Sequence, residues 1–309
     1  MKPVSTSYAA ESGIRDLQAR RDALQQTQSQ ISSGRKVAGP GDDPVAAAGA
    51  ERARAHLSRI GIEQRALVFA RNQLGAADGA LSDASGLLQS ARESLVAAGN
   101  GTYNASDRAT LAAQLAQTRD QLLAVANSSD GAGGFVFGGM GSRGAPFQAG
   151  AAPGAPVVYT AAPGEQQVGT QLVLSSSLDG AAAFTAQPAA GGGTQNVFAV
   201  LDGAIAALRD PAATSASLAP LVGGALAGVD SGLDAVQLKR TQVGEQLRAV
   251  DTREQTLSGN ALQAESTRSD LVDVDLAQAL SQLSNQQTSL DAAMRTYAQI
   301  SQMSLFKYL

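Results

Sequence analysis

A heptad seam in the last 34 residues constrains the fold of this chain more than any other feature of its sequence. From Leu276 to Tyr297, apolar residues recur at alternating steps of four and three, and neither Gly nor Pro interrupts the run. This spacing is typical of a coiled-coil helix, which would be roughly 50 Å long at 1.5 Å per residue. The seam consists of Leu276, Leu280, Leu283, Gln287, Leu290, Met294 and Tyr297, and it widens into Ile300, Met303, Leu305, Phe306 and Tyr308.

This helix is expected to have partners on more than one side. An isolated helix is only marginally stable in water. The polar face is mostly Ser and Gln, and from Leu276 onward the only charged residues are Asp291, Arg295 and Lys307. So weakly charged a surface tolerates the close approach of several neighbours.

The N-terminal residues repeat the pattern. Their seam consists of Ile14, Leu17, Arg21, Leu24, Gln28 and Ile31. We therefore predict that the two terminal helices pair with each other. The predicted fold is mainly α: a long antiparallel helical bundle or coiled coil built from both termini, with a small β-rich domain inserted in the middle.

Long helices are predicted between the termini and the insertion. A breaker-rich linker ends at Pro44, where Asp42 or Asp43 is expected to cap a helix that runs to about Ala98. Ser106 or Asp107 is expected to cap the next helix. Further helical patterns cover residues 195–209 and 218–268. The first long helix carries a Leu/Ala seam of Leu74, Ala77, Leu81, Ala84, Leu88, Ala91, Leu95 and Ala98.

The middle of the chain changes character at residue 127. Gly alternates with apolar residues around Phe135 and Phe137, which predicts a hairpin. The Gly, Ala and Pro-rich stretch that follows contains two strand-like segments, 156–160 and 171–175. We predict three parts: residues 1–40 with 275–309 as a terminal coiled coil, 41–147 with 194–274 as a long-helix domain that includes the hairpin, and 148–193 as a β-rich surface insertion.

Composition excludes several classes of function. The chain has no Cys, so Cys-ligated metals, disulfides and thiol nucleophiles are excluded. The formal net charge of −4 gives no general basic footprint, so no nucleic-acid partner is expected. No run of 18 apolar residues and no apolar signal-peptide core occur, so neither a membrane partner nor Sec-type export is expected.

The motifs that could carry chemistry have simpler explanations. His56, the single histidine, lies in a charged helical stretch and is expected on a solvated face. Gly139, Gly141 and Gly144 match a dinucleotide fingerprint, but Ala-Pro-Phe follows instead of the helix that would hold the phosphates. Asp270, Asp273 and Asp275 lack the Gly and the distal Glu of a calcium loop. Asp273 or Asp275 is expected to cap the last helix, and the others to favour its N-terminal dipole. We therefore expect no catalytic, cofactor or metal site.

Taken together and in order, several stretches resemble a known family. The chain resembles the hook-filament junction proteins of the bacterial flagellum (hook-associated protein, FlgL type) and, more distantly, flagellin. LVDVD before a heptad helix that ends in SLF is closer to the junction protein, and residues 148–193 show no specific match. The matching stretches are ISSGRKVAGPGDDPVAA (31–47), residues 100–139, APF (145–147), NVFAVLDGAIAAL (196–208), SDLVDVDLAQA (269–279), NQQTSLDAAM (285–294) and SLFKYL (304–309).

The resemblance implies a function and partners. In that family the terminal helices pair as a coiled coil that lines the inner tube of the filament, and the chain leaves the cell largely unfolded through the flagellar type III apparatus. It implies a structural adaptor at the hook-filament junction, outside the cell. The implied partners are copies of itself in a ring, the other hook-associated junction protein, flagellin and an export chaperone on the C-terminal helix.

The assembly interface is expected on the two terminal seams. Two alternatives stay open: the chain could be flagellin itself, or an enzyme whose insertion offers Glu165 and Asp179 as acid and base. A non-enzymatic role is preferred. The predicted interface residues are Ile14, Leu17, Leu24, Ile31, Leu276, Leu280, Leu283, Leu290, Met294, Tyr297, Ile300, Leu305 and Phe306.

Overall fold

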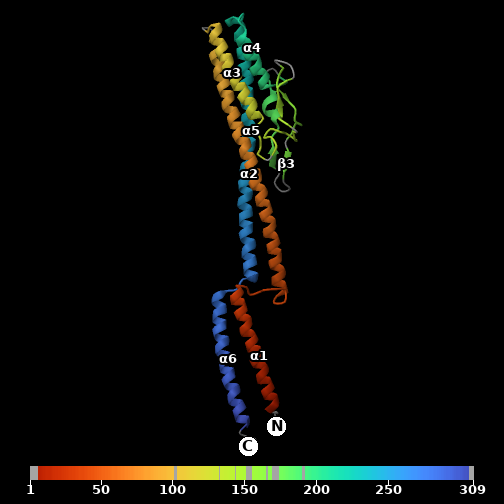
Figure 1. Ribbon diagram of the computed structural model, residues 1–309, viewed down its shortest axis with the longest axis vertical. Helices are drawn as coiled ribbons and strands as arrows, with labels where there is room; N and C mark the ends of the chain where they lie inside the picture. Colours follow the sequence, from red (N-terminus) through yellow and green to blue (C-terminus); the bar gives the residue numbers. More distant parts are fainter. Residues whose placement is uncertain are drawn as a thin grey trace. The chain divides into compact units, whose positions relative to one another are not determined.

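Six helices carry most of the architecture of the described residues (Figure 1). The computed structural model describes residues 6–100, 103–131, 133–142, 144–150, 155–164, 166–168, 174–189 and 192–305. Strands are limited to short pairs in the middle of the chain, so the predicted mainly-α class is confirmed. The helices are α1 (Thr6–Ser33), α2 (Pro44–Ala98), α3 (Ala105–Ala126), α4 (Val197–Arg209), α5 (Ser215–Val272) and α6 (Leu276–Leu305).

The chain divides into two compact units. The first unit is Met1–Ile62 with Leu257–Leu309, and the second is Glu63–Thr256. Both boundaries lie inside long helices, α2 and α5. The three-part division made from the sequence stays a prediction.

The core of the second unit follows the Leu/Ala seam of α2. All eight predicted seam residues from Leu74 to Ala98 are at most 5% exposed. Val229, Val236, Val243 and Val250 of α5 are fully buried at heptad spacing. Ala and Val fill this bundle because their short side chains let helices approach closely.

Capping residues fix where the helices begin. The Asp43 carboxylate accepts hydrogen bonds from the first amides of α2, at 2.9 Å to both Val45 N and Ala46 N, as predicted. For α3 the prediction was wrong, because Asn104 is the N-cap. Asp107 completes a capping box by accepting from the Asn104 amide at 3.2 Å.

The middle of the chain forms three small antiparallel strand pairs. They are β1 (Phe147–Gln148) with β2 (Val158–Tyr159), β3 (Gln166–Val168) with β4 (Leu174–Ser177), and β5 (Gln187–Pro188) with β6 (Thr194–Gln195). A π-helical turn, η1 (Ala181–Thr185), lies between β4 and β5. Part of the second predicted strand, residues 171–173, lies outside the described residues. Around Phe135 and Phe137 the described residues form isolated bridges, Ser129 to Phe135 and Gly138 to Asp179.

An aromatic cluster attaches this middle segment to α4. The rings of Phe147 and Phe184 lie 5.5 Å apart edge to face, and Phe147 also lies 6.0 Å from Phe198 of α4. The Tyr159 hydroxyl donates to the Phe137 carbonyl at 3.2 Å. Burial, with help from the charge of Asp179, raises the pKa of Tyr159 to about 12. The hydroxyl therefore stays protonated and keeps its donor role.

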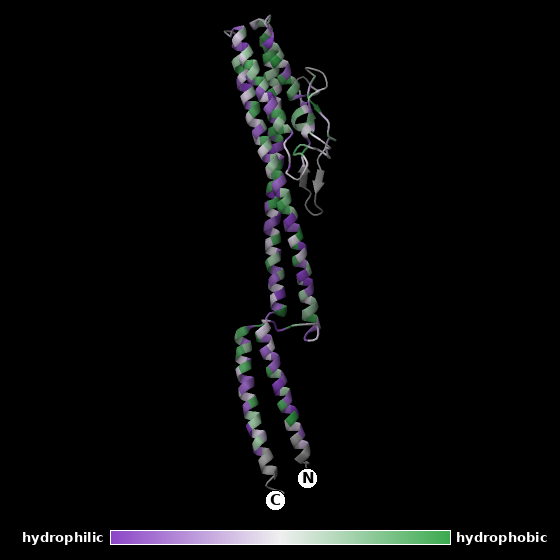
Figure 2. Ribbon diagram, in the orientation of Figure 1, coloured by the Kyte–Doolittle hydropathy of each residue, from purple (hydrophilic) through white to green (hydrophobic). Residues whose placement is uncertain are grey.

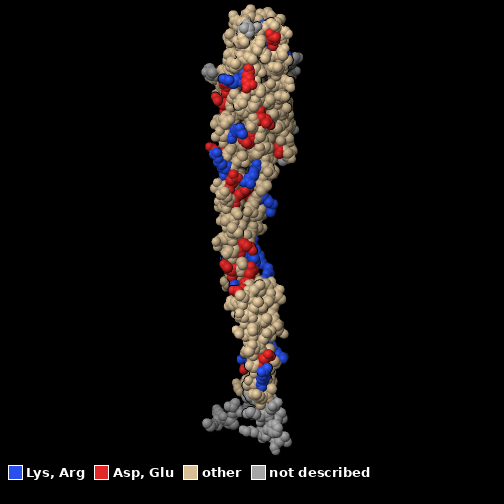
Figure 3. Space-filling view, turned by 90° about the vertical axis from the view of Figure 1, so that its left-hand side faces the viewer, with Lys and Arg blue, Asp and Glu red and all other residues tan. Residues whose placement is uncertain are grey.

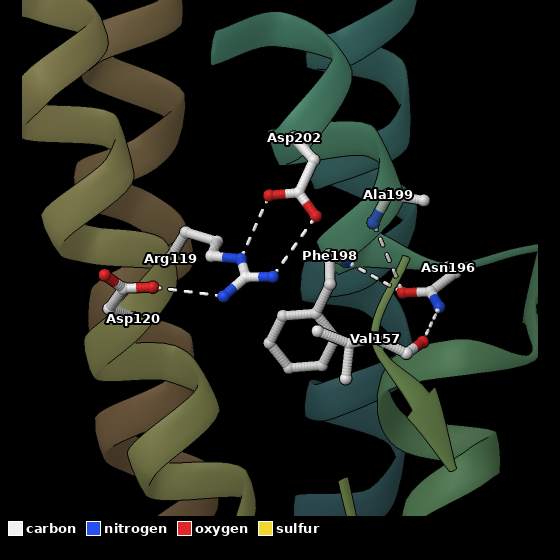
Figure 4. A network of polar contacts seen from close by, with 7 residues as sticks. All are labelled: Arg119, Asp120, Val157, Asn196, Phe198, Ala199 and Asp202. Atoms are coloured by element: carbon white, nitrogen blue, oxygen red, sulfur yellow. Dashed lines mark hydrogen bonds and ion pairs between the residues drawn. The ribbon is translucent and has the colours of Figure 1, made fainter. Parts of the chain in front are cut away.

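Polar contacts orient α3, α4 and the insertion around each other (Figure 4). Arg119 of α3 binds both oxygens of Asp202 of α4, at 3.0 and 3.2 Å. Asn196 caps α4 through Phe198 N at 2.9 Å and also donates to the Val157 carbonyl at 2.7 Å. One side chain thus joins the start of a helix to the strand segment packed beside it.

Ion pairs link α2 with α5 outside the apolar seam. Arg71 pairs with Asp251 and with Glu254, Arg92 with Asp230, Arg240 with Asp78, and Arg253 with Glu63. Figure 3 shows blue and red side chains gathered next to each other on the face in view. Most of these pairs are partly exposed, so each adds little stability.

By length and composition alone, one helix of the described residues, α5, is apolar enough to cross a membrane. The core helix of a soluble bundle passes the same test, and the valines of α5 lie in the core of this bundle.

Candidate assembly surface

Helices α1 and α6 pack side by side and antiparallel, as the sequence predicts (Figure 1). Three contacts along the pair show the register. Near the N-terminus the ring of Tyr297 lies against Gly13, where an added Cβ would come within 3.0 Å of the ring. Midway, Arg20 donates to the Ser289 hydroxyl. At the far end Val274 N donates to the Gly34 carbonyl at 3.0 Å.

The seam that closes this pair differs in phase from the predicted one. The buried and half-buried positions at heptad spacing are Ala279, Leu283, Gln286, Leu290, Ala293 and Tyr297 in α6, and Gly13, Leu17, Leu24, Thr27 and Ile31 in α1. They step by four and three, except for the full heptad from Leu17 to Leu24, where Arg20 is exposed. Leu17, Leu24, Ile31, Leu283, Leu290 and Tyr297 belong to both the predicted and the observed seams. They form what we call the shared column of each helix.

Four predicted interface residues are exposed. Their exposed fractions are 44% for Ile14, 53% for Leu276, 54% for Leu280 and 38% for Met294. The side chains of Ile300 and Leu305 are not described, and Phe306 lies outside the described residues. The structure therefore brings together the shared column, and it leaves the other described members of the predicted interface facing solvent.

Small and polar residues take the places that the sequence analysis gave to larger ones. Ala279 is 3% exposed and Thr27 is 5% exposed. The side-chain amide oxygen of Gln286, Oε1, is buried and lacks a hydrogen-bond partner among the described residues. Counting large apolar residues could not find these positions, because a seam built on Gly, Ala, Thr and Gln gives no hydropathy signal.

Three of the four exposed apolar residues share one face of the pair. Ile14 lies four residues after position 10, which is one heptad before Leu17. Leu280 lies four residues after Leu276, and Met294 lies four residues after Leu290. Four residues advance a helix by about 40° beyond a full turn, and the helices run in opposite directions. Both sets are therefore turned toward the same side of the pair, which we call the outer face: Ile14, Leu280 and Met294. Leu276, one heptad before Leu283, is in line with the shared column and is exposed at the first turn of α6. Figure 2 shows hydrophobic and hydrophilic residues interleaved along both helices.

Charged residues are absent from the C-terminal half of α1 and the N-terminal half of α6. Residues 23–34 and 276–290 contain no Asp, Glu, Lys or Arg. Figure 3 shows a corresponding band without blue or red side chains on the visible face. Contacts made by this band need not remove charges from water, a desolvation that would otherwise oppose association.

The loop after α1 pairs with the segment between α5 and α6. Gly34, with φ at 69°, ends α1 in a Schellman motif. The next residues then run antiparallel to residues 272–274: Lys36 N donates to the Val272 carbonyl at 2.8 Å, and Arg35 bridges Asp273. Val37 and Val272 are buried beneath this contact, at 8% and 3% exposure. We call the paired segments, residues 34–37 and 272–274, the junction clip.

The three Asp residues near the start of α6 have separate roles. Asp275 is the cap of α6, because its carboxylate accepts from Ala277 N and Gln278 N at 2.9 and 3.1 Å. Asp273 is held by Arg268 through two bonds of 3.2 and 3.1 Å. A hydrogen bond from Ser269, together with Arg268, lowers the pKa of Asp273 below its ordinary value. Asp270 contributes its carbonyl, which accepts from Lys36.

The remaining candidates for chemistry do not converge on a site in the described residues. His56 is exposed on α2. Asp179 accepts from Ala181 N at 2.9 Å at the start of η1, while Glu165 lies outside the described residues. No group of three or more potential metal ligands occurs within the described parts of the chain.

The comparisons with known sequences agree with the resemblance. Residues 4–142 match the family model described as the bacterial flagellin N-terminal helical region. The chain is 32% identical over 292 residues to flagellar hook-associated protein 3 of Escherichia coli and 33% identical to that of Salmonella typhimurium, with 90% of each chain covered. Flagellin E of Vibrio cholerae is 27% identical over 149 residues, which is 48% of this chain and 39% of that flagellin.

Solved structures share the fold. The flagellar junction protein FlgL of Legionella pneumophila aligns with a TM-score of 0.63 and 18% identity, covering 73% of this chain and all of that one. FlgL of Xanthomonas campestris aligns at 0.61 with 19% identity, covering 71% of this chain and 99% of that one. From the sequence identity over nine-tenths of its length, this chain belongs to the family of flagellar hook-associated protein 3, the FlgL-type structural proteins of the hook-filament junction in the bacterial flagellum.

Proposed function

We propose that the chain is a non-catalytic adaptor that joins the flagellar hook to the flagellin filament, and that it assembles through its terminal helices. The outer face carries this proposal. It presents Ile14, Leu280 and Met294 beside a seam that the two helices already close between themselves. Apolar side chains exposed along one face of a helix pair mark a surface for neighbouring subunits.

The neighbours in this proposal are other flagellar subunits. Copies of this chain form a ring, which contacts the other hook-associated junction protein on one side and flagellin on the other. An export chaperone covers the C-terminal helix before assembly, and export uses the flagellar type III apparatus. The family membership and the exposed outer face support these assignments.

Variants of the outer face test the proposal. The double variant Leu280→Asp, Met294→Asp places two charges on exposed positions, so the α1–α6 pair should keep its helical content. In a strain that lacks the wild-type protein, we expect it to abolish filament attachment. Leu262→Asp on α5, where the wild-type side chain is 72% exposed, is the matched control and should support normal attachment. Normal filaments on cells with the double variant would refute the proposal.

Variants of the shared column have a broader effect. Leu283→Asp or Leu290→Asp places a charge in the closed seam, so we expect loss of pairing as well as loss of assembly. The second unit should stay folded in both, because the seam of α2 does not depend on them.

Flagellin remains the second candidate, because the match to flagellin E covers half of the chain. Immunogold electron microscopy with an antibody against residues 148–193 separates the two. A single narrow band between hook and filament supports the adaptor, whereas label along the whole filament identifies a filament subunit. Label absent from flagella would contradict both.

A further inference from the structure

The junction clip lies at one end of the α1–α6 pair and continues the register of that pair. Gly34 lies opposite Val274 in the clip, Arg20 opposite Ser289 midway, and Gly13 opposite Tyr297 near the other end. The sums of the paired residue numbers, 308, 309 and 310, hardly change. The clip and the seam are therefore in one continuous register.

The chain connection alone does not determine that register. A slip of one heptad moves α6 along α1 by about 10 Å at 1.5 Å per residue. The loop from Gly34 to Asp43 has 10 residues and could extend to about 33 Å if it were released. The loop is thus long enough to permit a slip once residues 35–37 no longer pair with residues 272–274.

The seam by itself discriminates poorly between registers. Its buried positions include small or polar residues, Gly13, Thr27, Ala279, Gln286 and Ala293. The heptad repeat presents a similar pattern after a shift of seven residues, and weakly patterned pairs are prone to slip. Another element must therefore favour the native register.

We propose that Arg268 is a positioning residue that sets the register of the α1–α6 pair by holding Asp273 in the junction clip. The guanidinium binds both carboxylate oxygens of Asp273 at 3.2 and 3.1 Å. The main chain of Asp273 forms an antiparallel β-bridge with that of Arg35. Glu265, one turn earlier on α5, holds the same guanidinium at 2.9 and 3.1 Å. A bidentate pair of this kind fixes orientation as well as distance.

Lys36 and Gln30 complete the arrangement from the α1 side. Lys36 Nζ donates to the Asp270 carbonyl, and Gln30 Nε2 donates to the Lys36 carbonyl at 3.0 Å. The end of α1 is therefore joined to the last turn of α5, from which Arg268 projects. This inference does not depend on the proposed function, because the register can be measured in the isolated chain.

Engineered cysteine pairs test the register directly, because the chain contains no cysteine. Arg20→Cys with Ser289→Cys reports the native register. Arg20→Cys with Gln282→Cys, or with Thr296→Cys, reports a slip of one heptad in either direction. Each full-length double-cysteine protein is oxidised, and the fraction cross-linked is measured by non-reducing electrophoresis.

In Arg268→Ala we expect the ratio of native to slipped cross-link to fall by roughly threefold to tenfold, the range for losing a partly exposed charged hydrogen-bonded pair. Arg268→Lys keeps the charge but lacks the planar guanidinium. Its ratio of native to slipped cross-link should lie between those of the wild type and Arg268→Ala. Asp273→Ala should lower the ratio by a similar amount, and adding it to Arg268→Ala should lower the ratio little further. Arg253→Ala, which removes another arginine ion pair of α5, is the matched control and should leave the ratio unchanged.

Three outcomes would overturn the proposal. An unchanged ratio in Arg268→Ala would show that the seam sets its own register. Loss of both cross-links would show that Arg268 is needed for pairing itself rather than for register. Additive effects of Asp273→Ala and Arg268→Ala would show that Asp273 is not the partner through which Arg268 acts.

Discussion

The seam of α2 and the seam between α1 and α6 follow the same heptad spacing but are closed to different degrees. Every residue of the α2 seam from Leu74 to Ala98 is at most 5% exposed. In the terminal pair, Leu17, Leu24 and Leu283 are only half-buried, and Leu280 and Met294 remain outside. The comparison shows that a heptad pattern predicts a helix with an apolar stripe, whereas burial depends on how many helices cover it.

The largest effect is expected in the closed seam. Leu88 is fully buried, and Leu88→Ala removes three carbons from a tightly packed bundle. We expect a loss of about 2–5 kcal/mol in the stability of the second unit. Hydrogen exchange over residues 74–98 should accelerate accordingly, while exchange over α1 and α6 stays as in the wild type. A loss below about 0.5 kcal/mol would mean that this seam is not the core.

A smaller effect is expected in the terminal pair. Leu290 is 8% exposed in a seam of two helices, where neighbouring side chains and water can relax into the space. Leu290→Ala should therefore destabilise the α1–α6 pair by about 1–2 kcal/mol, measured by hydrogen exchange over α6. Leu280→Ala on the outer face is the control and should stay within about 0.5 kcal/mol of the wild type. Equal effects at both positions would remove the distinction between seam and outer face.

The smallest effect concerns the polar anchor of the terminal pair. The pKa of Asp273 is lowered by Ser269 and by Arg268, so its contribution to stability is present above the ordinary Asp value near 4 and is lost as pH falls through the lowered pKa. Arg268→Ala should raise the Asp273 pKa part of the way back, because Ser269 remains. Carboxyl NMR titration of the two proteins measures the shift. An Asp273 midpoint that does not move in the variant would contradict the ion pair.

Patterning predicted the parts of the fold in which large apolar side chains do the packing. Pro44 and Ala98 are the bounds of α2 in the sequence analysis and in the structure, because a cap, a proline and an unbroken Leu/Ala repeat all agree. The cap of α3 was missed because Asn104, Ser106 and Asp107 are all good capping residues and only geometry selects among them. The insertion was predicted only in outline, since strands of two to four residues depend on non-local pairing.

The seam between α1 and α6 was predicted in part for a related reason. Spacing alone identified the shared column, including Leu24 and Leu290, but it could not tell which neighbouring column faces the partner helix. The inner side is lined by Ala279 and Thr27, whereas the more hydrophobic Leu280 is exposed. The small residues face the partner helix because the two backbones approach closely there. A hydropathy pattern contains no information about that distance.

The uncharged band on α1 and α6 has a consequence for the conditions under which subunits can meet. Ions in solution screen attraction and repulsion between charged groups over about 10 Å at 0.1 M salt, and they leave contacts between Leu, Ser and Gln nearly untouched. The ion pairs between α2 and α5 weaken as salt concentration rises. Because residues 23–34 and 276–290 carry no charged side chain, a contact made through them depends less on salt concentration than the ion pairs of α2 and α5 do.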